Sequence, residues 1–171
     1  NGIHDRTDYD LSRHQEYSGK NMNYLDPVTG EHYIPYVVEY SIGADRLMLA
    51  VLCEAYEEET LEGGDVRTVM HFHPALAAYK AAILPLQKSL APKAREVREL
   101  LAKRFMVTYD EAGSIGKRYR RQDEIGTPFC VTIDFDTLEN NTVTIRDRDT
   151  MSQIRLDIGE VAAYVEKAME H

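Results

Sequence analysis

The chain has 171 residues, of which 43% are hydrophobic and 29% charged, and its formal net charge is −9. This composition is typical of one or two folded domains with a hydrophobic core, and it argues against a disordered chain. The sequence holds no apolar run near the ~20 residues of a membrane-spanning helix, and its acidic charge argues against indiscriminate binding to membranes or DNA.

The first sixty residues predict a helix, a strand and a second helix. Residues 5–19 begin with acidic side chains and end at a glycine, which indicates a short polar helix. A turn at residues 26–30 precedes a β-rich strand through Val38. Residues 44–59 place apolar side chains at positions 47, 49, 51, 52 and 55, a spacing that predicts a mostly buried helix with an acidic exit.

The rest of the chain alternates between strand-like and helix-like segments. Residues 60–68 contain two glycines among charged side chains and predict a linker, after which a second domain begins. The alternation implies parallel strands with helical crossovers, completed by an antiparallel hairpin. We therefore expect an α/β fold with a mixed five-stranded sheet and three helices. The expected strands are residues 81–86, 105–110, 128–135 and both arms of 140–158, and the expected helices are 92–105, 116–126 and 159–171.

The cysteines and two neighbouring histidines give no sign of a redox or metal site. Cys53 and Cys130 lie far apart, and neither forms a C-x-x-C pair, so we expect buried free thiols in a reducing compartment. His71 and His73 alternate, as two metal ligands on one strand face can. No third ligand stands at a recognisable spacing, so we expect a structural or surface role for both histidines and no metal site.

Residues 113–117, Gly-Ser-Ile-Gly-Lys, match a phosphate-binding loop only in part. That loop needs a glycine where this chain has Glu111, and a serine or threonine where it has Arg118. We therefore reject a nucleotide-binding loop of this kind. The glycines instead predict a tight entry into a helix whose first N–H groups can face an anion.

The helix expected over residues 116–126 carries four cations within five positions of an otherwise acidic chain. One interpretation is a solvated helix in which Arg120 and Glu124, four residues apart, form an ion pair. The other is a nucleic-acid contact, in which cations neutralise phosphates while neighbouring polar side chains read base edges. In that case the phosphate contacts are Lys117, Arg118 and Arg121, and the base contacts are Gln122, Asp123 or Glu124.

A second candidate site lies where the first expected strand meets the following helix. In a strand over residues 37–41, Glu39 and Ser41 point to the same face, where a carboxylate and a hydroxyl suit a substrate ammonium group. Arg46, in the first turn of the helix, can grip phosphate oxygens with its forked guanidinium. The alternative is a surface ion pair of Arg46 with Glu39 or Asp45.

Five blocks of sequence carry a family resemblance. They are RTDYDLSRH at 6–14, PYVVEYSIGADRLMLA at 35–50, HPALAAYKAAILPL at 73–86, GSIGKRYRRQDEIGTPFCVT at 113–132 and TVTIRDRDTM at 142–151. In this order they resemble the C-terminal part of the homodimeric class II glycyl-tRNA synthetases of many bacteria, archaea and eukaryotes. The resemblance covers nearly the whole chain.

The resemblance implies two domains. Residues 1–72 would end a catalytic domain built on an antiparallel sheet, with the third class II motif as strand 36–41 and helix 43–55. Residues 73–171 would form the anticodon-binding domain, a mixed α/β fold shared by several class II synthetases. That fold agrees with the order of elements predicted from the residues.

The resemblance also implies roles for single residues. Arg46 matches the catalytic motif arginine that contacts ATP phosphates, while Glu39 and Ser41 match the Glu-x-Ser that helps to hold glycine. Arg6 and Asp8 fall in a block near the active site. The implied cofactors are ATP and Mg²⁺, with ligands mostly outside this chain. The implied partners are tRNA(Gly), glycine, ATP and a second identical subunit, in the cytoplasm.

Two features depart from the family pattern. Tyr40 stands where many relatives have proline, and the first two class II motifs are absent. We therefore expect a fragment, which also lacks an initiator methionine, that does not catalyse aminoacylation alone. Two alternatives stay open: a non-catalytic accessory module that binds tRNA, and a small α/β domain that binds a phosphate metabolite through residues 113–117.

Overall fold

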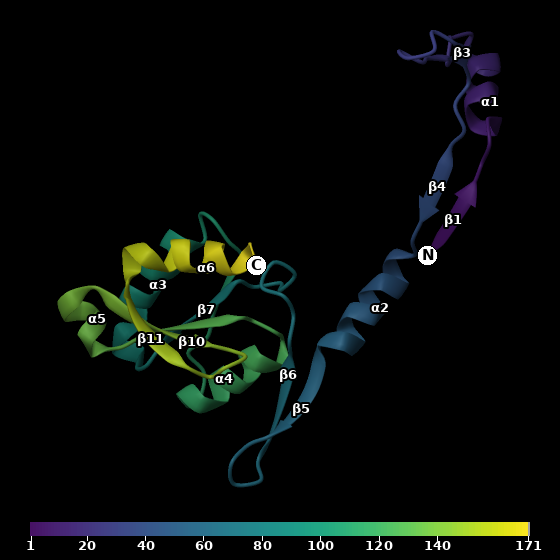
Figure 1. The fold of residues 1–171 in the computed structure, drawn as a ribbon. Helices are drawn as coiled ribbons and strands as arrows, with labels where there is room; N and C mark the ends of the chain where they lie inside the picture. Colours follow the sequence, from purple (N-terminus) through teal and green to yellow (C-terminus); the bar gives the residue numbers. More distant parts are fainter. Residues whose placement is uncertain (171) are drawn as a thin grey trace. The chain divides into compact units, whose positions relative to one another are not determined.

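The structure, a computed structural model, describes residues 1–170 and divides into two compact units (Figure 1). The first unit is Asn1–Ala50, and the second runs from Val51 onward. Within residues 1–170, no helix combines the length and the apolar character that crossing a bilayer requires.

The first unit is small and open. Its strand β1 (Gly2–Asp5) pairs antiparallel with β4 (Val38–Ser41), so that Ser41 lies opposite Gly2 and Glu39 opposite His4. None of residues 1–50 is buried. The predicted polar helix and the following turn are confirmed, whereas the predicted strand starts at Val38 instead of ending there. The remaining elements are α1 (Tyr9–Ser18), β2 (Tyr24–Leu25), β3 (His32–Tyr33) and the start of α2 (Ala44–Ala55).

Helix α2 differs from its prediction in burial and in length. Only Ala55 is buried, and the apolar side chains of Leu47, Leu49 and Leu52 are exposed, as is Cys53. The prediction of a mostly buried helix and of a buried Cys53 is therefore wrong for this chain. The segment with this apolar spacing does form a helix, but no segment of residues 1–170 covers the apolar side of that helix.

The helix also stops before the acidic run, because Tyr56 begins a strand. Strand β5 (Tyr56–Thr60) pairs antiparallel with β6 (Val66–Met70), and the glycines between them form the turn of this hairpin. The predicted linker is thus a hairpin turn. Because the hairpin belongs to the second compact unit, the units divide after Ala50, and not after residue 72. As an assignment of functional domains, the boundary at residues 72 and 73 stays a prediction.

The second unit is built on the predicted mixed five-stranded sheet, whose strand order is β11-β10-β9-β7-β8. Strand β7 pairs in parallel with both β8 and β9, and β10 pairs antiparallel with β9 and β11. The prediction of parallel strands extended by a hairpin is confirmed. The strands are β7 (Ala81–Pro85), β8 (Val107–Tyr109), β9 (Phe129–Ile133), β10 (Thr142–Asp147) and β11 (Gln153–Asp157).

Helices cover both faces of this sheet (Figure 1). Helices α3 (Ala91–Leu101) and α6 (Val161–Met169) bury their apolar residues with those of the sheet in one cluster, which holds Ile83 and Val131. Helix α4 (Ile115–Glu124) packs Ile115 and Tyr119 against the other face. The short helix α5 (Phe135–Asn140), which the sequence analysis missed, and the 3₁₀ turns η1 (Lys88–Leu90) and η2 (Ile158–Glu160) complete the unit.

Cys130, in the middle of β9, is one of the buried core residues. Burial raises the pKa of its thiol to about 12. The group therefore stays protonated and unreactive at neutral pH, because the thiolate is the nucleophilic form. The expectation of a buried free thiol is confirmed for this cysteine.

Candidate functional site

The structure brings Ser41 and Arg46 together at an open, polar hollow on the first unit. Both residues line it, because β4 ends at Ser41 and α2 begins three residues later. Within residues 1–170, Arg46 forms no ion pair with Glu39 or Asp45, so the surface ion pair considered as an alternative is absent. The guanidinium is therefore available for an anion. The other residues that line the hollow are Asn1, Gly2, His4, Ile42 and Gly43.

Glu39 lies on the same strand but outside the lining of this hollow. Its Oε2 is 3.6 Å from Nε of Arg6, and its side chain is half exposed. Arg6 also donates two hydrogen bonds to the carboxylate of Asp10, at 3.0 and 2.8 Å. These hydrogen bonds lower the pKa of Asp10. Arg6 thus holds two acidic side chains beside the strand pair.

The amino end of α4 lies at the carboxyl edge of the parallel strands, where the loop from Asp110 follows β8. Lys117 is exposed there and forms no ion pair or side-chain hydrogen bond with residues 1–170. Arg121 donates to Oδ2 of Asp110 from Nε at 2.9 Å and from Nη2 at 2.6 Å, and its side chain is 43% exposed. Both cations can be reached by a ligand from solvent.

Three other predicted tRNA contacts on α4 are buried, and the prediction is wrong for them. Arg118 is 4% exposed and donates a hydrogen bond of 2.6 Å to the carbonyl oxygen of Pro85, the last residue of β7. Gln122 accepts a hydrogen bond from the hydroxyl of Thr127. Asp123 is 1% exposed. These side chains lie on the face of the helix that packs against the sheet, so they cannot contact RNA.

Asp123 is the centre of a buried ionic cluster. Its carboxylate accepts hydrogen bonds from Arg146 of β10 at 2.8 and 3.1 Å, and from Arg67 of β6 at 3.2 Å. The guanidinium of Arg146 also lies over the ring of Tyr119, 4.9 Å from its centroid. No local sequence pattern predicts this cluster, because the partners of Asp123 are 23 and 56 residues away from it along the chain.

Arg120 does not form the ion pair predicted with Glu124. It instead donates to the carboxylate of Asp65 and to the carbonyl oxygen of Val66, at 2.7 Å, on the β5–β6 hairpin. Glu124 stays exposed, with no ion pair among residues 1–170. The positive charge of α4 is thus partly compensated, as the solvated-helix interpretation expected. The compensating carboxylate comes from another part of the unit and not from the helix itself.

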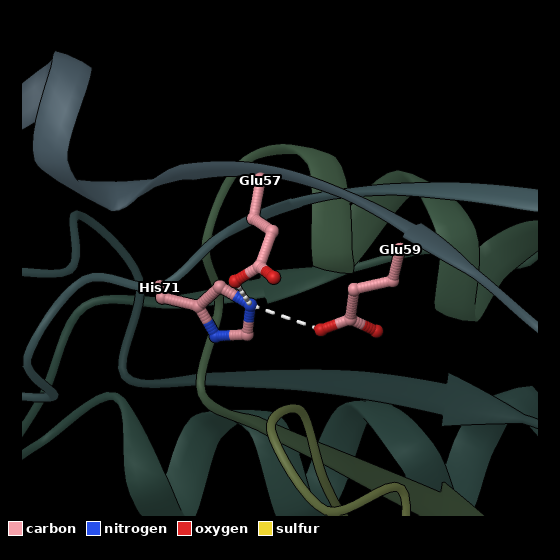
Figure 2. A group of neighbouring side chains, drawn as sticks. All are labelled: Glu57, Glu59 and His71. Atoms are coloured by element: carbon pink, nitrogen blue, oxygen red, sulfur yellow. Dashed lines mark hydrogen bonds and ion pairs between the residues drawn. The ribbon is translucent and has the colours of Figure 1, made fainter.

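His71, directly after β6, lies among carboxylates. Figure 2 shows its ring facing Glu57 and Glu59, both from β5. The Nε2 atom is 3.0 Å from Oε1 of Glu59 and 3.5 Å from Oε2 of Glu57, and Nδ1 is 2.6 Å from Oδ1 of Asp149. His73 is not part of this group. The acids were not recognised as partners of His71 because residues 56–59 were predicted to continue a helix.

The chain matches a family model and is similar in sequence to known proteins. The family model described as an anticodon binding domain matches residues 80–168. Over 169 residues, 99% of this chain, the sequence is 64% identical to a glycine–tRNA ligase of Clostridium kluyveri, and 36% of that relative is covered. The identity to a glycine–tRNA ligase of Geobacillus kaustophilus is 63%, over 97% of this chain and 36% of that relative. The chain thus spans about a third of the length of the curated relatives it matches.

Among solved structures, about half of this chain resembles part of a larger protein. The crystal structure of histidyl-tRNA synthetase from Nostoc sp. PCC 7120 matches 53% of this chain and 22% of its own, with a TM-score of 0.51. The sequence identity is 21%, so this likeness concerns the fold alone.

Proposed function

Because the chain belongs to the anticodon-binding domain family through residues 80–168, we propose that it is the C-terminal part of a glycine–tRNA ligase. The observation that carries this proposal is the 64% identity to such a ligase over 99% of the chain. In the parent protein the carboxylate of glycine would attack the α-phosphate of ATP and release pyrophosphate. A ribose hydroxyl of the tRNA would then take the glycyl group from the adenylate.

The first unit would contribute to the amino-acid and ATP site. Arg46 would contact ATP phosphates, and Ser41, beside it in the hollow, would help to hold glycine together with Glu39. The residues that line the hollow include no carboxylate. They therefore suit an anion better than Mg²⁺, whose oxygen ligands would come from the upstream chain. The open hollow and the exposed apolar side of α2 support a site that the upstream chain completes.

The carboxyl edge of the five-stranded sheet would contact tRNA. Ligands of open α/β sheets commonly bind outside the carboxyl ends of the strands. Lys117 and Arg121 would neutralise phosphates there, and Glu124, one turn further along the same exposed face, would be free to read a base edge. The partner would be the glycine-accepting tRNA. From the family resemblance, the proposal also includes a homodimeric state, the use of Mg²⁺ and a cytoplasmic location.

The first prediction compares the chain with the full-length protein. The full-length protein is expected to charge tRNA with glycine in the presence of ATP, whereas the 171-residue chain alone is expected to show no ATP–pyrophosphate exchange. The reason is that two of the three class II motifs are missing from the chain. Both activities are measured with radiolabelled substrates. Robust exchange by the chain alone would contradict the fragment proposal, and charging with a different amino acid would overturn the proposed substrate.

The second prediction concerns the salt dependence of tRNA binding by the full-length protein. Lys117→Ala is expected to weaken binding and to reduce the slope of log K against log salt by about 0.7–0.9, the contribution of one phosphate contact. The measurement is a series of binding curves at several salt concentrations. The matched control is Lys103→Ala, another exposed lysine that forms no ion pair with residues 1–170, which follows α3 and therefore lies at the amino edge of the parallel strands. An equal change of slope in both variants would show that Lys117 is not a specific phosphate contact of the tRNA interface.

A further inference from the structure

A group of three possible metal ligands lies at the base of the β5–β6 hairpin. Glu57 and Glu59 are two residues apart on β5, so both side chains project from the same face of the hairpin (Figure 2). His71 follows the last residue of β6 and its backbone N–H donates to the carbonyl oxygen of Ala55. Its ring therefore lies beside the two carboxylates. One ligand atom from each of the three residues lies within 4.8 Å of the others.

The spacing of these atoms suits a small tetrahedral cation. Zinc binds imidazole nitrogen at about 2.0–2.1 Å and carboxylate oxygen at about 2.0–2.2 Å, so neighbouring ligand atoms of a tetrahedral site are about 3.3 Å apart. The Nε2 atom of His71 is 3.0 Å from Oε1 of Glu59 and 3.5 Å from Oε2 of Glu57. Both of these distances lie within about 0.3 Å of the tetrahedral value, and the ligand oxygens of the two glutamates are at most 4.8 Å apart.

The imidazole is oriented for such a role by a fourth carboxylate. Nδ1 of His71 lies 2.6 Å from Oδ1 of Asp149, the arrangement that fixes the proton on Nδ1 of metal-binding histidines and leaves Nε2 as the ligand. Asp149 is itself held by the buried Arg148, from Nε at 2.7 Å and from Nη2 at 2.9 Å. The carboxylate of Asp149 is therefore held in place against the imidazole from its other side.

Glu59 is positioned in a similar way. Its Oε2 accepts a hydrogen bond of 2.8 Å from Nε of Arg67, a side chain that is 1% exposed. This interaction leaves Oε1, the oxygen nearest His71, to face the group. The ligand oxygen of Glu59 and the ligand nitrogen of His71 are thus each fixed by contacts outside the three ligands.

The charges of the group suit a cation between its members. With the proton of His71 on Nδ1, the electron-rich Nε2 atom faces two carboxylate oxygens, and the partial negative charge of the nitrogen repels them. A second proton on Nε2 would relieve this repulsion with one hydrogen bond. A divalent cation would relieve it for all three ligands at once. One nitrogen and two oxygens suit a borderline ion such as zinc better than Mg²⁺, which prefers oxygen ligands and octahedral geometry.

We propose that Nε2 of His71 and one carboxylate oxygen each of Glu57 and Glu59 bind a zinc-type divalent cation, with water in the fourth position and Asp149 orienting the imidazole. The bound ion joins the first strand of the hairpin to the residue that follows the second. It therefore fastens the hairpin at its base. This assignment is independent of the proposed ligase activity, because none of the four residues belongs to the substrate or tRNA sites described above.

The test is a titration of the full chain, freed of metal, with Zn²⁺ alone in competition with a chromophoric chelator. One saturable equivalent is expected, together with a rise in the melting temperature of the chain. His71→Ala and Glu57→Gln are each expected to weaken binding at least about tenfold, and Asp149→Asn by about 10–100-fold. Glu57 is 63% exposed and glutamine keeps its shape, so Glu57→Gln tests the site without disturbing the fold. Cobalt in place of zinc would give visible absorption bands that reveal four-coordinate nitrogen and oxygen ligation.

Matched controls lie next to the site. His73→Ala removes a neighbouring exposed histidine, and Glu58→Gln removes an acid from the opposite face of β5, so both are expected to bind Zn²⁺ unchanged. The proposal is overturned if no saturable binding occurs, or if the controls lose as much affinity as the site variants. Binding of Mg²⁺ as tightly as Zn²⁺ would also overturn it, since it would indicate a general acidic surface.

Discussion

Replacement of Asp123 by alanine is expected to destabilise the second compact unit by about 3–5 kcal/mol. Asp123 is 1% exposed, and its carboxylate is the shared partner of Arg67 and Arg146, which are 1% and 7% exposed. Without it, Arg146 loses the one carboxylate it pairs with among residues 1–170, and Arg67 keeps Glu59 alone, while both buried guanidinium groups still bear the cost of their desolvation. Asp123→Asn is expected to fall between alanine and the wild type, because the amide oxygen still accepts hydrogen bonds but carries no charge.

The measurement is urea unfolding of the full chain, followed by far-ultraviolet circular dichroism. Glu124→Ala is the matched control, because Glu124 is the next residue on the same helix, is exposed, and has no ion pair among residues 1–170. Its effect is expected to stay within about 0.5 kcal/mol. Unfolding of both variants at the same urea concentration would show that the buried cluster does not stabilise the fold.

Gly126→Ala is expected to cost about 2–5 kcal/mol of stability, through two separate effects. Gly126 follows α4 with φ +78°, where a residue with a Cβ atom is strained by about 1–2 kcal/mol. A Cβ atom there would also lie 2.8 Å from the carbonyl oxygen of Met70 and would overlap the ring of Phe72. Relieving that overlap requires movement of backbone next to His71, at a cost of about 1–3 kcal/mol.

Gly113→Ala separates the two effects. Gly113 has φ +77°, but a Cβ atom at this position would meet nothing closer than Cδ of Lys117, at 4.0 Å. Its loss of stability should therefore report the backbone strain alone, about 1–2 kcal/mol. Thermal and urea unfolding of the two variants give the difference, which is the cost of the overlap with Phe72 and Met70. Equal losses at both positions would show that this close packing does not matter.

The fold of the second unit could be predicted from sequence because its signals are local. Residues 81–85 form a short, fully buried apolar strand, and Pro92 and Gly126 mark the start and the end of helices. The hairpin at residues 56–70 could not be predicted in this way. Its first strand reads as an acidic extension of α2, and only pairing with β6 makes it a strand.

The exposed side of α4 could be predicted only in part from the sequence, for a related reason. Charge alone does not tell which side of α4 faces the sheet. The apolar pair Ile115 and Tyr119, four residues apart, gives that direction, since both pack against the sheet. Lys117, Arg121 and Glu124 then share the exposed side. A hydrophobic-face analysis of the helix would therefore have excluded the buried members, Arg118, Gln122 and Asp123.

The position of Asp123 has a consequence for how the second unit unfolds. A lone two-stranded hairpin is at best marginally stable in water. Here Arg67 ties the second strand of the hairpin to α4, and the same carboxylate ties α4 to β10 through Arg146. If the hairpin opened, Asp123 and Arg146 would stay buried without Arg67. If the sheet opened, the contact between Asp123 and Arg67 that holds the hairpin would be lost. The two therefore melt as one cooperative block, although the hairpin adds no strand to the sheet.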